Sequence, residues 1–191
     1  MNHEEYAAEL LAHIGRLTNG HKYPSGLTAA QWMAIRYFAR ANHMSRTVSA
    51  FAEFHATTRG TASQTVKSLV ERGFLLRIAS KQDGRSQVIN LTRKGQKFSH
   101  SDPIQELELA VSDLPTNDLK KLVKILERIV SEISSQRAQN NFGKCPNCRF
   151  LDQHDYQGSS TTYKCNFADE SLNSADLGLI CINFKTSPRR R

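Results

Sequence analysis

The sequence predicts a mainly α-helical fold that carries one small β-hairpin and ends in a small cysteine-rich appendage. Three observations indicate this fold class. Apolar residues recur at spacings of three and four over most of the chain, as they do on one face of an amphipathic helix. A single Asp-Gly turn signal stands between two short apolar runs. All four cysteines lie beyond position 144, and 191 residues suit one domain plus an appendage.

The first two helices are predicted from apolar spacing and from capping residues. Residues 3–18 form the first, which ends at Asn19-Gly20. Thr28 is expected to cap the second helix, because Gln31 follows three residues later as in a capping box. This helix extends to about residue 42.

Two shorter helices and a hairpin follow. A short helix is expected near residues 46–55, and a second one runs from the capping pair Thr57/Thr58 to Gly73. Residues 74–78 and 87–91 are predicted as two strands around the polar, basic turn between them. Three helices before a basic hairpin are typical of a winged helix-turn-helix.

Three further helices are interrupted by prolines. Thr92 caps a helix that is expected to break at Asp102-Pro103. After a helix over 103–114, Thr116 is expected to cap a long one with an apolar face. The residues predicted to point inward are Leu119, Leu122, Val123, Leu126, Ile129, Val130 and Ile133.

Positive charge is confined to one part of the chain. The whole chain has a net charge of +8, whereas residues 27–99 alone carry twelve Lys and Arg against three acidic residues, a net of +9. A localised basic field attracts a polyanion, most often nucleic acid. A surface that is basic only for solubility would spread its charge more evenly.

At this point residues 27–98 resemble the MarR family of bacterial transcriptional regulators. The matching pattern is Leu27-Thr28-x-x-Gln31, then the run from Thr58 to Leu69, then Glu71-Arg72-Gly73-Phe74-Leu75, Asp83-x-Arg85 and Leu91-Thr92-x-Lys94-Gly95. The resemblance implies a winged helix-turn-helix flanked by dimerisation helices, a homodimer, and double-stranded DNA as partner. Wings in this family commonly read Asp-Arg-Arg. Here the middle position is Gly84, so one potential contact with the DNA backbone is missing.

The second helix of the helix-turn-helix is expected to read the major groove. Arg59 and Gln64 are candidates for base edges, because Arg pairs with guanine and Gln with adenine. Lys67 and Thr58 are expected to contact phosphates. The resemblance implies that Asp83 braces Arg85 at the tip of the wing. The full set of predicted DNA-binding residues is Thr58, Arg59, Thr61, Ser63, Gln64, Lys67 and Arg85.

The helices outside the reading unit carry more apolar surface than one domain needs. We expect residues 1–26 and 100–140 to form a shared dimer interface on either side of the DNA-binding unit at 27–99. Relatives in the family bind small phenolic or lipophilic acids near such an interface, which implies an effector pocket. Its candidate residues are Tyr6, His13, Trp32, Tyr37 and Phe38, although aromatic residues at this spacing are more often core.

The four cysteines predict a metal centre in residues 141–191, a segment that ends in a basic tail. Cys145 and Cys148 form a Cys-x-x-Cys knuckle, and Cys165 and Cys181 complete four thiolates for one site. A short segment with few apolar residues needs such a staple. Zinc suits the knuckle, an iron–sulfur cluster tolerates the irregular spacing, and metal-free redox thiols remain a third alternative. His154 could replace one cysteine. We expect the reading unit to have a core separate from this appendage.

Several classes of function are not supported by the sequence. No apolar run approaches the ~20 residues of a membrane span, and the acidic first helix is unlike a secretory leader, so we expect a cytoplasmic protein. No hydrolase triad, phosphate loop or paired-carboxylate motif is visible. Nothing orients Cys148 and His154 as a catalytic pair, so we do not expect an enzyme.

Overall fold

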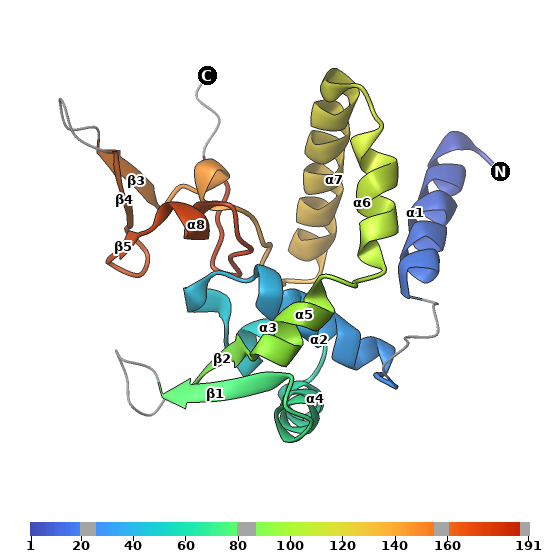
Figure 1. The fold of residues 1–191 in the computed structure, drawn as a ribbon. Coiled ribbons are helices and arrows are strands. Elements are labelled where there is room, and N and C mark those ends of the chain that lie inside the picture. The colour runs from blue at the N-terminus through green and yellow to red at the C-terminus, as the bar shows by residue number, and fades with distance from the viewer. Residues whose placement is uncertain (20–25, 80–86, 155–160, 188–191) are drawn as a thin grey trace.

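The computed structural model describes residues 1–19, 26–79, 87–154 and 161–187. Figure 1 shows a central unit of helices and a hairpin, with a group of three helices and the cysteine-rich appendage standing above it in that view. The elements in chain order are α1 (His3–Asn19), α2 (Ala29–Arg40), the 3-10 helix η1 (His43–Ser45), α3 (Val48–Phe54), α4 (Arg59–Glu71), β1 (Leu75–Ala79), β2 (Gln87–Leu91), α5 (Arg93–Ser99), α6 (Ile104–Ser112), α7 (Thr116–Gln136), the 3-10 helix η2 (Cys145–Asn147), β3 (Leu151–His154), β4 (Thr162–Cys165), β5 (Glu170–Leu172) and α8 (Ser174–Leu177). This confirms the predicted mainly α-helical winged helix-turn-helix.

The helices of the central unit begin at the predicted capping residues. Thr28 accepts a hydrogen bond from the backbone N–H of Gln31 and donates its own N–H to the Gln31 side chain, so the capping box is complete. The Thr58 and Thr92 side chains each accept the N–H of the residue three positions later. Each cap satisfies a backbone donor that the first helical turn would leave unpaired.

The central unit is built around a helix that is buried on one side. Trp32, Ile35 and Phe38 of α2 are almost fully buried against α3, α4 and the hairpin. β1 and β2 pair antiparallel from Leu75 opposite Leu91 to Ala79 opposite Gln87. These contacts place α3 and α4 as a helix-turn-helix, with the hairpin beside α4 (Figure 1).

α1, α6 and α7 form an arm that is tied to the central unit by a buried ion pair. Arg36 of α2 makes two hydrogen bonds of 2.7 and 2.6 Å to Asp102, which is 3% exposed and also accepts the N–H of Ile104. The predicted interruption at Asp102-Pro103 is therefore a fixed junction. The expected cap at Thr116 is wrong by one residue, because Pro115 occupies the N-cap position and Thr116 is the first helical residue.

The apolar faces of the arm are not covered within one chain. Neither α6 nor α7 contains a buried residue. Of the α7 residues predicted to point inward, Leu119, Leu122, Leu126 and Val130 are half-buried, whereas Val123, Ile129 and Ile133 are exposed. On α1 the predicted stripe of Tyr6, Leu10, Ile14 and Leu17 is also exposed. No helix in the described part of the chain has the length and apolarity to cross a membrane.

The appendage is a three-stranded antiparallel sheet, β3-β4-β5, followed by α8. Among its described residues, its own buried cluster consists of Cys145, Cys165 and Leu172. The expectation of a separate core for the reading unit is wrong in one respect, because Ile182 of the appendage is 4% exposed and belongs to the core of the central unit. Burial of this apolar side chain joins the end of the chain to the winged helix.

Candidate DNA-reading surface and cysteine cavity

The outer face of α4 carries the polar residues predicted to contact DNA. Ala62, Val66 and Leu69 are buried on the opposite face, so the helix period directs the other side outward. The six residues that the sequence assigned to α4 and its cap are all exposed; they are Thr58, Arg59, Thr61, Ser63, Gln64 and Lys67. The structure therefore brings this part of the predicted site together on one surface.

The N-terminal end of α4 is electrostatically suited to a phosphate. Its first turn contains no acidic residue, and a 13-residue helix has a partial positive charge at this end. Arg59 stands there and is oriented by a 2.9 Å hydrogen bond from Nε to the Ser49 hydroxyl of α3. Further along α4, Lys67 lies 3.9 Å from Glu71, so its charge is partly balanced.

The two strands of the hairpin place additional basic residues beside α4. Arg77 is exposed on β1 and donates a 3.1 Å hydrogen bond to the side chain of Gln87 on β2. Arg77 was not among the predicted contacts, and strand alternation does not identify it, because residues two apart share a face and Leu75 is buried. Asp83 and Arg85 lie outside the described residues.

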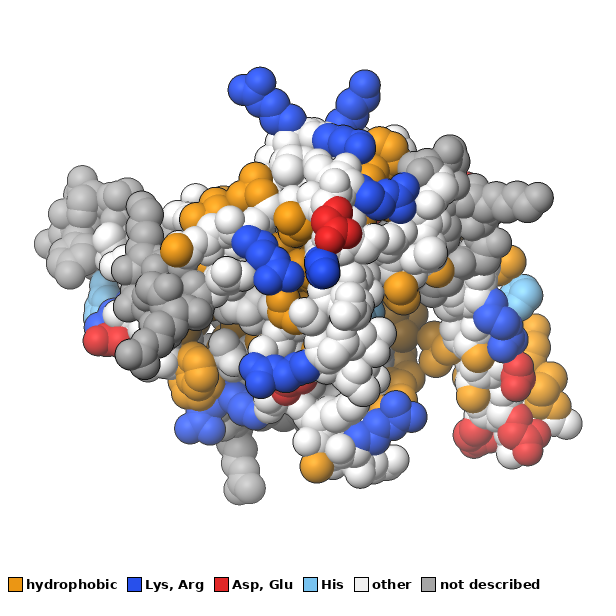
Figure 2. Space-filling model, turned by 90° about the horizontal axis from the view of Figure 1, so that it is seen from below, with side chains coloured by type: hydrophobic (Ala, Val, Ile, Leu, Met, Phe, Trp, Pro, Cys, Tyr) orange, Lys and Arg blue, Asp and Glu red, His pale blue; other side chains and the backbone are white. Residues whose placement is uncertain are grey.

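The face that contains α4 is predominantly basic. Figure 2 views the molecule from this side and shows Lys and Arg side chains spread over the central unit, with most of the acidic side chains gathered on the helical arm. Since net positive charge on one face gives an attractive field for polyanions, this distribution agrees with the charge predicted for residues 27–99.

The five candidate effector residues do not lie together in the single chain. Trp32, Tyr37 and Phe38 are buried in the core of the central unit, where the Tyr37 hydroxyl donates a 2.7 Å hydrogen bond to the Ser45 carbonyl. Tyr6 and His13 are exposed on α1. A separate cavity of about 400 Å³ lies between α2, β2 and α5, and Phe38 is the only one of the five that lines it.

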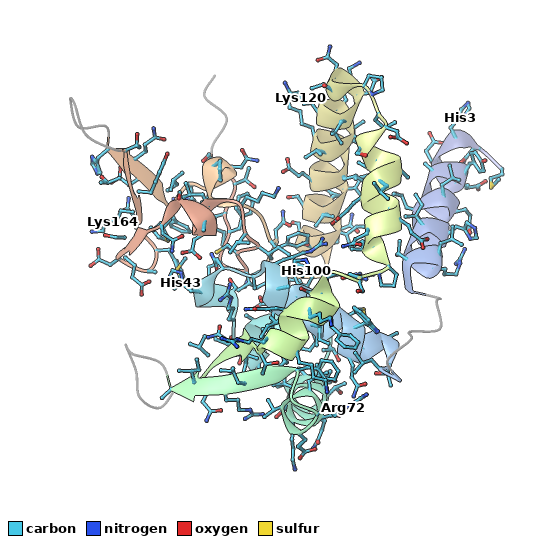
Figure 3. The ribbon with its side chains drawn as sticks, viewed as in Figure 1. His3, His43, Arg72, His100, Lys120 and Lys164 are labelled. Carbon is cyan, nitrogen blue, oxygen red and sulfur yellow. The ribbon has the colours of Figure 1, made fainter. Side chains whose placement is uncertain are left out.

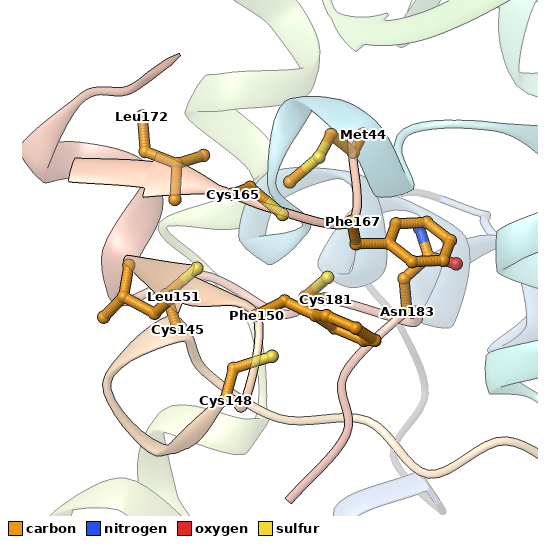
Figure 4. A pocket seen from close by; sticks show the side chains of 10 residues that line it. All are labelled: Met44, Cys145, Cys148, Phe150, Leu151, Cys165, Phe167, Leu172, Cys181 and Asn183. Atoms are coloured by element: carbon orange, nitrogen blue, oxygen red, sulfur yellow. The ribbon is translucent and has the colours of Figure 1, made fainter. Parts of the chain in front are cut away.

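The four cysteines line one small cavity (Figure 4). Cys145, Cys165 and Cys181 are buried and Cys148 is half-buried, and all four are free thiols. The cavity has about 10 Å³ of room for the centre of a water-sized sphere. Its other lining residues are Met44, Phe150, Leu151, Phe167, Leu172 and Asn183. His154 does not line it and instead lies 3.2 Å from Asp152.

Burial in the cavity raises the pKa of two of the thiols, Cys145 and Cys181. Burial, reinforced by the nearby Cys181, Cys148 and Cys165 sulfurs, raises the pKa of Cys145 to about 11. Burial also raises the pKa of Cys181, against the opposing effect of hydrogen bonds from Asn42, Asn183 and Ser45. Ionisation of these sulfurs would require positive charge in the cavity, as metal ligation supplies. Among the described residues, no group of three or more His, Cys, Asp or Glu side chains is placed to hold a metal ion.

The cavity is attached directly to the segment that precedes α3. The backbone of Ile180 exchanges hydrogen bonds with Arg40 and Asn42, and the N–H of Ile182 donates to the Ser45 hydroxyl at 3.1 Å. His43, the first residue of η1, lies 2.8 Å from Glu170 and 3.2 Å from Asp176, and Figure 3 shows it on the side of η1 that faces the appendage. No motif in residues 41–46 predicted these contacts, because they join positions 127 or more residues apart.

Taken together, these features define the class of protein. An exposed polar helix held by a buried helix pair, with a basic hairpin beside it, is the architecture of a winged helix-turn-helix. Residues 25–86, which contain the helix-turn-helix and the first strand of the hairpin, match the family model described as MarR family. The cysteine-rich segment lies outside that match.

Several solved structures have the same fold. The S. aureus MepR-DNA complex is 20% identical with a TM-score of 0.54, over 70% of this chain and 99% of that chain. A MarR transcriptional regulator from Methanosarcina mazei Go1 is 18% identical with a TM-score of 0.52, over 67% and 96%. CouR from Rhodococcus jostii RHA1, bound to p-coumaroyl-CoA, is 18% identical with a TM-score of 0.53, over 64% and 90%. No curated protein matches the chain.

Proposed function

We propose that the protein is a sequence-specific DNA-binding transcriptional repressor that acts in the cytoplasm. The observation that carries this proposal is the exposed polar face of α4 next to the basic hairpin. Arg59 and Gln64 read base edges, while Thr58 and Lys67 contact phosphates. Thr61 and Ser63 complete the contact surface on α4, and Arg85 adds the contact that the sequence predicts for the wing.

The protein binds DNA as a homodimer on an inverted repeat. One reading helix contacts too few base pairs for useful specificity, and a two-fold dimer doubles the site. The exposed apolar side chains of α1 and α7, among them Leu17 and Ile125, supply the surface that a second copy would cover.

Two solved relatives support the choice of partners. MepR was solved in complex with DNA, and CouR was solved with p-coumaroyl-CoA bound. We therefore expect double-stranded DNA as the main partner and a small-molecule effector as a second one. Because Tyr6 and His13 lie on the uncovered arm, the candidate residues could approach an effector only in the assembled dimer.

Selection from a pool of random DNA duplexes tests the function. We expect an inverted repeat to emerge, bound with an affinity that falls steeply as salt rises. Gln64→Ala should lose about 1–3 kcal/mol of discrimination at one position of each half-site, and Arg85→Ala should weaken binding to all sequences. Gln139→Ala, at an exposed glutamine beyond α7, is the matched control and should leave binding unchanged.

One outcome would favour a different class of function. If the full-length protein showed no preference for any duplex over the random pool, the winged helix would serve as a protein-interaction module instead. An unchanged affinity for Arg85→Ala at physiological salt would disprove the assignment of the wing, but not that of α4.

A further inference from the structure

We propose that the ion pair between Arg36 and Asp102 fixes the angle between the arm and the central unit, and that this angle sets the spacing of the two half-sites that the dimer binds. The arm consists of α1, α6 and α7, and the central unit carries the reading helix α4. The role rests on the proposed function, because a spacing exists only where a homodimer binds an inverted repeat. Neither residue belongs to the predicted DNA-binding set, so both act by positioning.

The arm is attached to the central unit at two places. At the first, Asp102 and Pro103 connect α5 to α6. At the second, the chain returns after α7, and the ring of Phe142 lies 4.7 Å, centroid to centroid, from that of Phe54 in α3. Between these places α6 and α7 contain no buried residue, and Figure 1 shows both helices rising away from the central unit. A body attached at two points can rotate about the line that joins them, so the contacts at its base determine its angle.

The first attachment contains an ion pair with two parallel hydrogen bonds. Nε and Nη2 of Arg36 donate bonds of 2.7 and 2.6 Å to the two carboxylate oxygens of Asp102. A guanidinium that binds a carboxylate in this way fixes the direction of its partner as well as the distance. The Asp102 side chain is 2% exposed and that of Arg36 16%, so water competes little for these bonds. The pair therefore resists rotation at the base of the arm.

Each partner of the ion pair is part of a well-fixed element. Arg36 lies on α2, where its neighbours Ile35 and Tyr37 are almost fully buried in the core of the central unit. Oδ1 of Asp102 also accepts the backbone N–H of Ile104 at the start of α6, at 3.0 Å. The pair thus joins a helix of the central core directly to the first turn of the arm.

The charge of Arg36 depends on Asp102 for its balance. Within the described part of the chain, Arg36 forms an ion pair with no other acidic side chain. Burial, reinforced by the positive charge of Arg36, lowers the pKa of His55 to about 4, so His55 next to the end of α3 is neutral at pH 7. Removal of the Asp102 charge would leave the guanidinium without its partner in a site that is largely shielded from water.

A second ion pair connects the same two helices further along the arm. Arg40 follows Arg36 by four residues and lies on the same face of α2. Its Nη2 lies 2.6 Å from Oε1 of Glu108 on α6. Both of these side chains are exposed, and exposed ion pairs contribute little because water and salt weaken them. We therefore assign the control of the angle to the buried pair.

A change of one base pair in the spacing requires a large movement of each reading helix. Each added base pair lengthens the duplex by about 3.4 Å and rotates it by about 35°. The two-fold axis divides this difference between the subunits, so each α4 has to move by about 1.7 Å along the duplex and about 17° around it. Hydrogen bonds weaken steeply when they are bent. A junction fixed by two short bonds opposes this movement more strongly than a junction with one.

Duplexes that differ only in half-site spacing test this role. The full-length protein is titrated with the inverted repeat selected above, and with versions whose spacer is one base pair longer or shorter. The unmodified protein should bind the selected spacing most tightly. Asp102→Asn should reduce this discrimination roughly tenfold, which corresponds to one charge-assisted hydrogen bond. Base preferences within each half-site should not change, because the asparagine keeps an oxygen for the N–H of Ile104 and α4 is not altered.

A second variant and two controls make the test specific. Arg36→Lys keeps the positive charge but cannot form two parallel bonds, so it should also relax the spacing. It provides the result if Asp102→Asn does not fold. Asp113→Asn makes the same change at an exposed position next to the end of α6 and should leave the spacing preference as it is. Glu108→Gln, at the exposed ion pair, should have a smaller effect than either variant.

The outcomes separate the spacing role from the proposed function. Full spacing discrimination in both Asp102→Asn and Arg36→Lys would disprove the role of the ion pair and leave the DNA-binding function intact. The same conclusion would follow if the variants weakened binding equally at every spacing, or if Asp113→Asn relaxed the spacing as much as they do. A protein that selects no inverted repeat would disprove the dimeric function together with the spacing role.

Discussion

The winged-helix unit and the cysteine-rich appendage are stabilised in different ways. The first buries a continuous set of large side chains, including Trp32, Phe38 and Leu69. The second has a small buried cluster of Cys145, Cys165 and Leu172, against which Met44 of η1 packs. Burial of apolar area is the main stabilising contribution to folding. The difference therefore indicates that the first unit depends on its own core, whereas the second depends strongly on its attachment to the first.

Matched leucine substitutions in the two regions should separate these modes of stabilisation. Leu69→Ala, at a fully buried position of α4, should lower the free energy of unfolding by about 3–5 kcal/mol, because the packed core cannot close the cavity. Leu172→Ala should cost about 1–2 kcal/mol and affect the appendage alone, since its smaller cluster can relax. Denaturant unfolding with hydrogen exchange measures both. If both variants lost the same free energy of global unfolding, the two regions would not differ in how they are stabilised.

Ile182 is the residue that the division into two regions does not describe. It belongs to the appendage in sequence, but it packs in the core of the winged helix. Ile182→Ala should destabilise the winged helix by about 2–4 kcal/mol and reduce amide protection in α2. Ile78→Ala, at a half-exposed position on β1, is the control and should change stability by less than about 0.5 kcal/mol. Loss of protection confined to β3–β5 would show that the two cores are independent.

The smallest expected effect is a pH dependence of the contact between the two regions. Burial lowers the pKa of His43, but hydrogen bonds to Glu170 and Asp176 raise it by more, so the pKa is raised overall. The stabilisation is therefore complete below the unfolded value of about 6.5 and is lost as pH rises through the folded pKa. Because the His43 side chain is 42% exposed, we expect less than about 1 kcal/mol.

Amide protection in β5 and α8, measured at pH 6 and pH 8.5 and corrected for intrinsic exchange, reports this contact. It should decrease at the higher pH in the unmodified protein. In His43→Gln, which keeps a hydrogen-bonding side chain without a titration, the decrease should disappear. A decrease that persists in His43→Gln would assign the pH dependence to another group.

Local signals in the sequence were sufficient for much of the fold. The caps at Thr28, Thr58 and Thr92 and the strands of the hairpin depend on residues a few positions apart, so they could be predicted directly. Pro115 displaced the expected cap from Thr116, because proline supplies the N-cap backbone without a side-chain acceptor.

In the candidate site, too, some features follow from local sequence and others depend on tertiary contacts. The outward face of α4 follows from the helix period and from the buried position of Val66. The roles of Asn42, Ser45 and Ile182 could not be predicted, since they depend on contacts between distant parts of the chain. Where the cysteine sulfurs stand relative to one another likewise depends on tertiary structure and not on their spacing in sequence.

The position of Ile182 in the core has a consequence for protein synthesis. The winged helix ends near residue 99, yet its core is completed by a residue 83 positions later in the chain. At about 5–20 residues per second, a ribosome needs roughly 4–17 s to supply it. A nascent or truncated chain therefore presents the reading helix on an incomplete core, and only a fully translated chain attains the full stability of its DNA-reading unit.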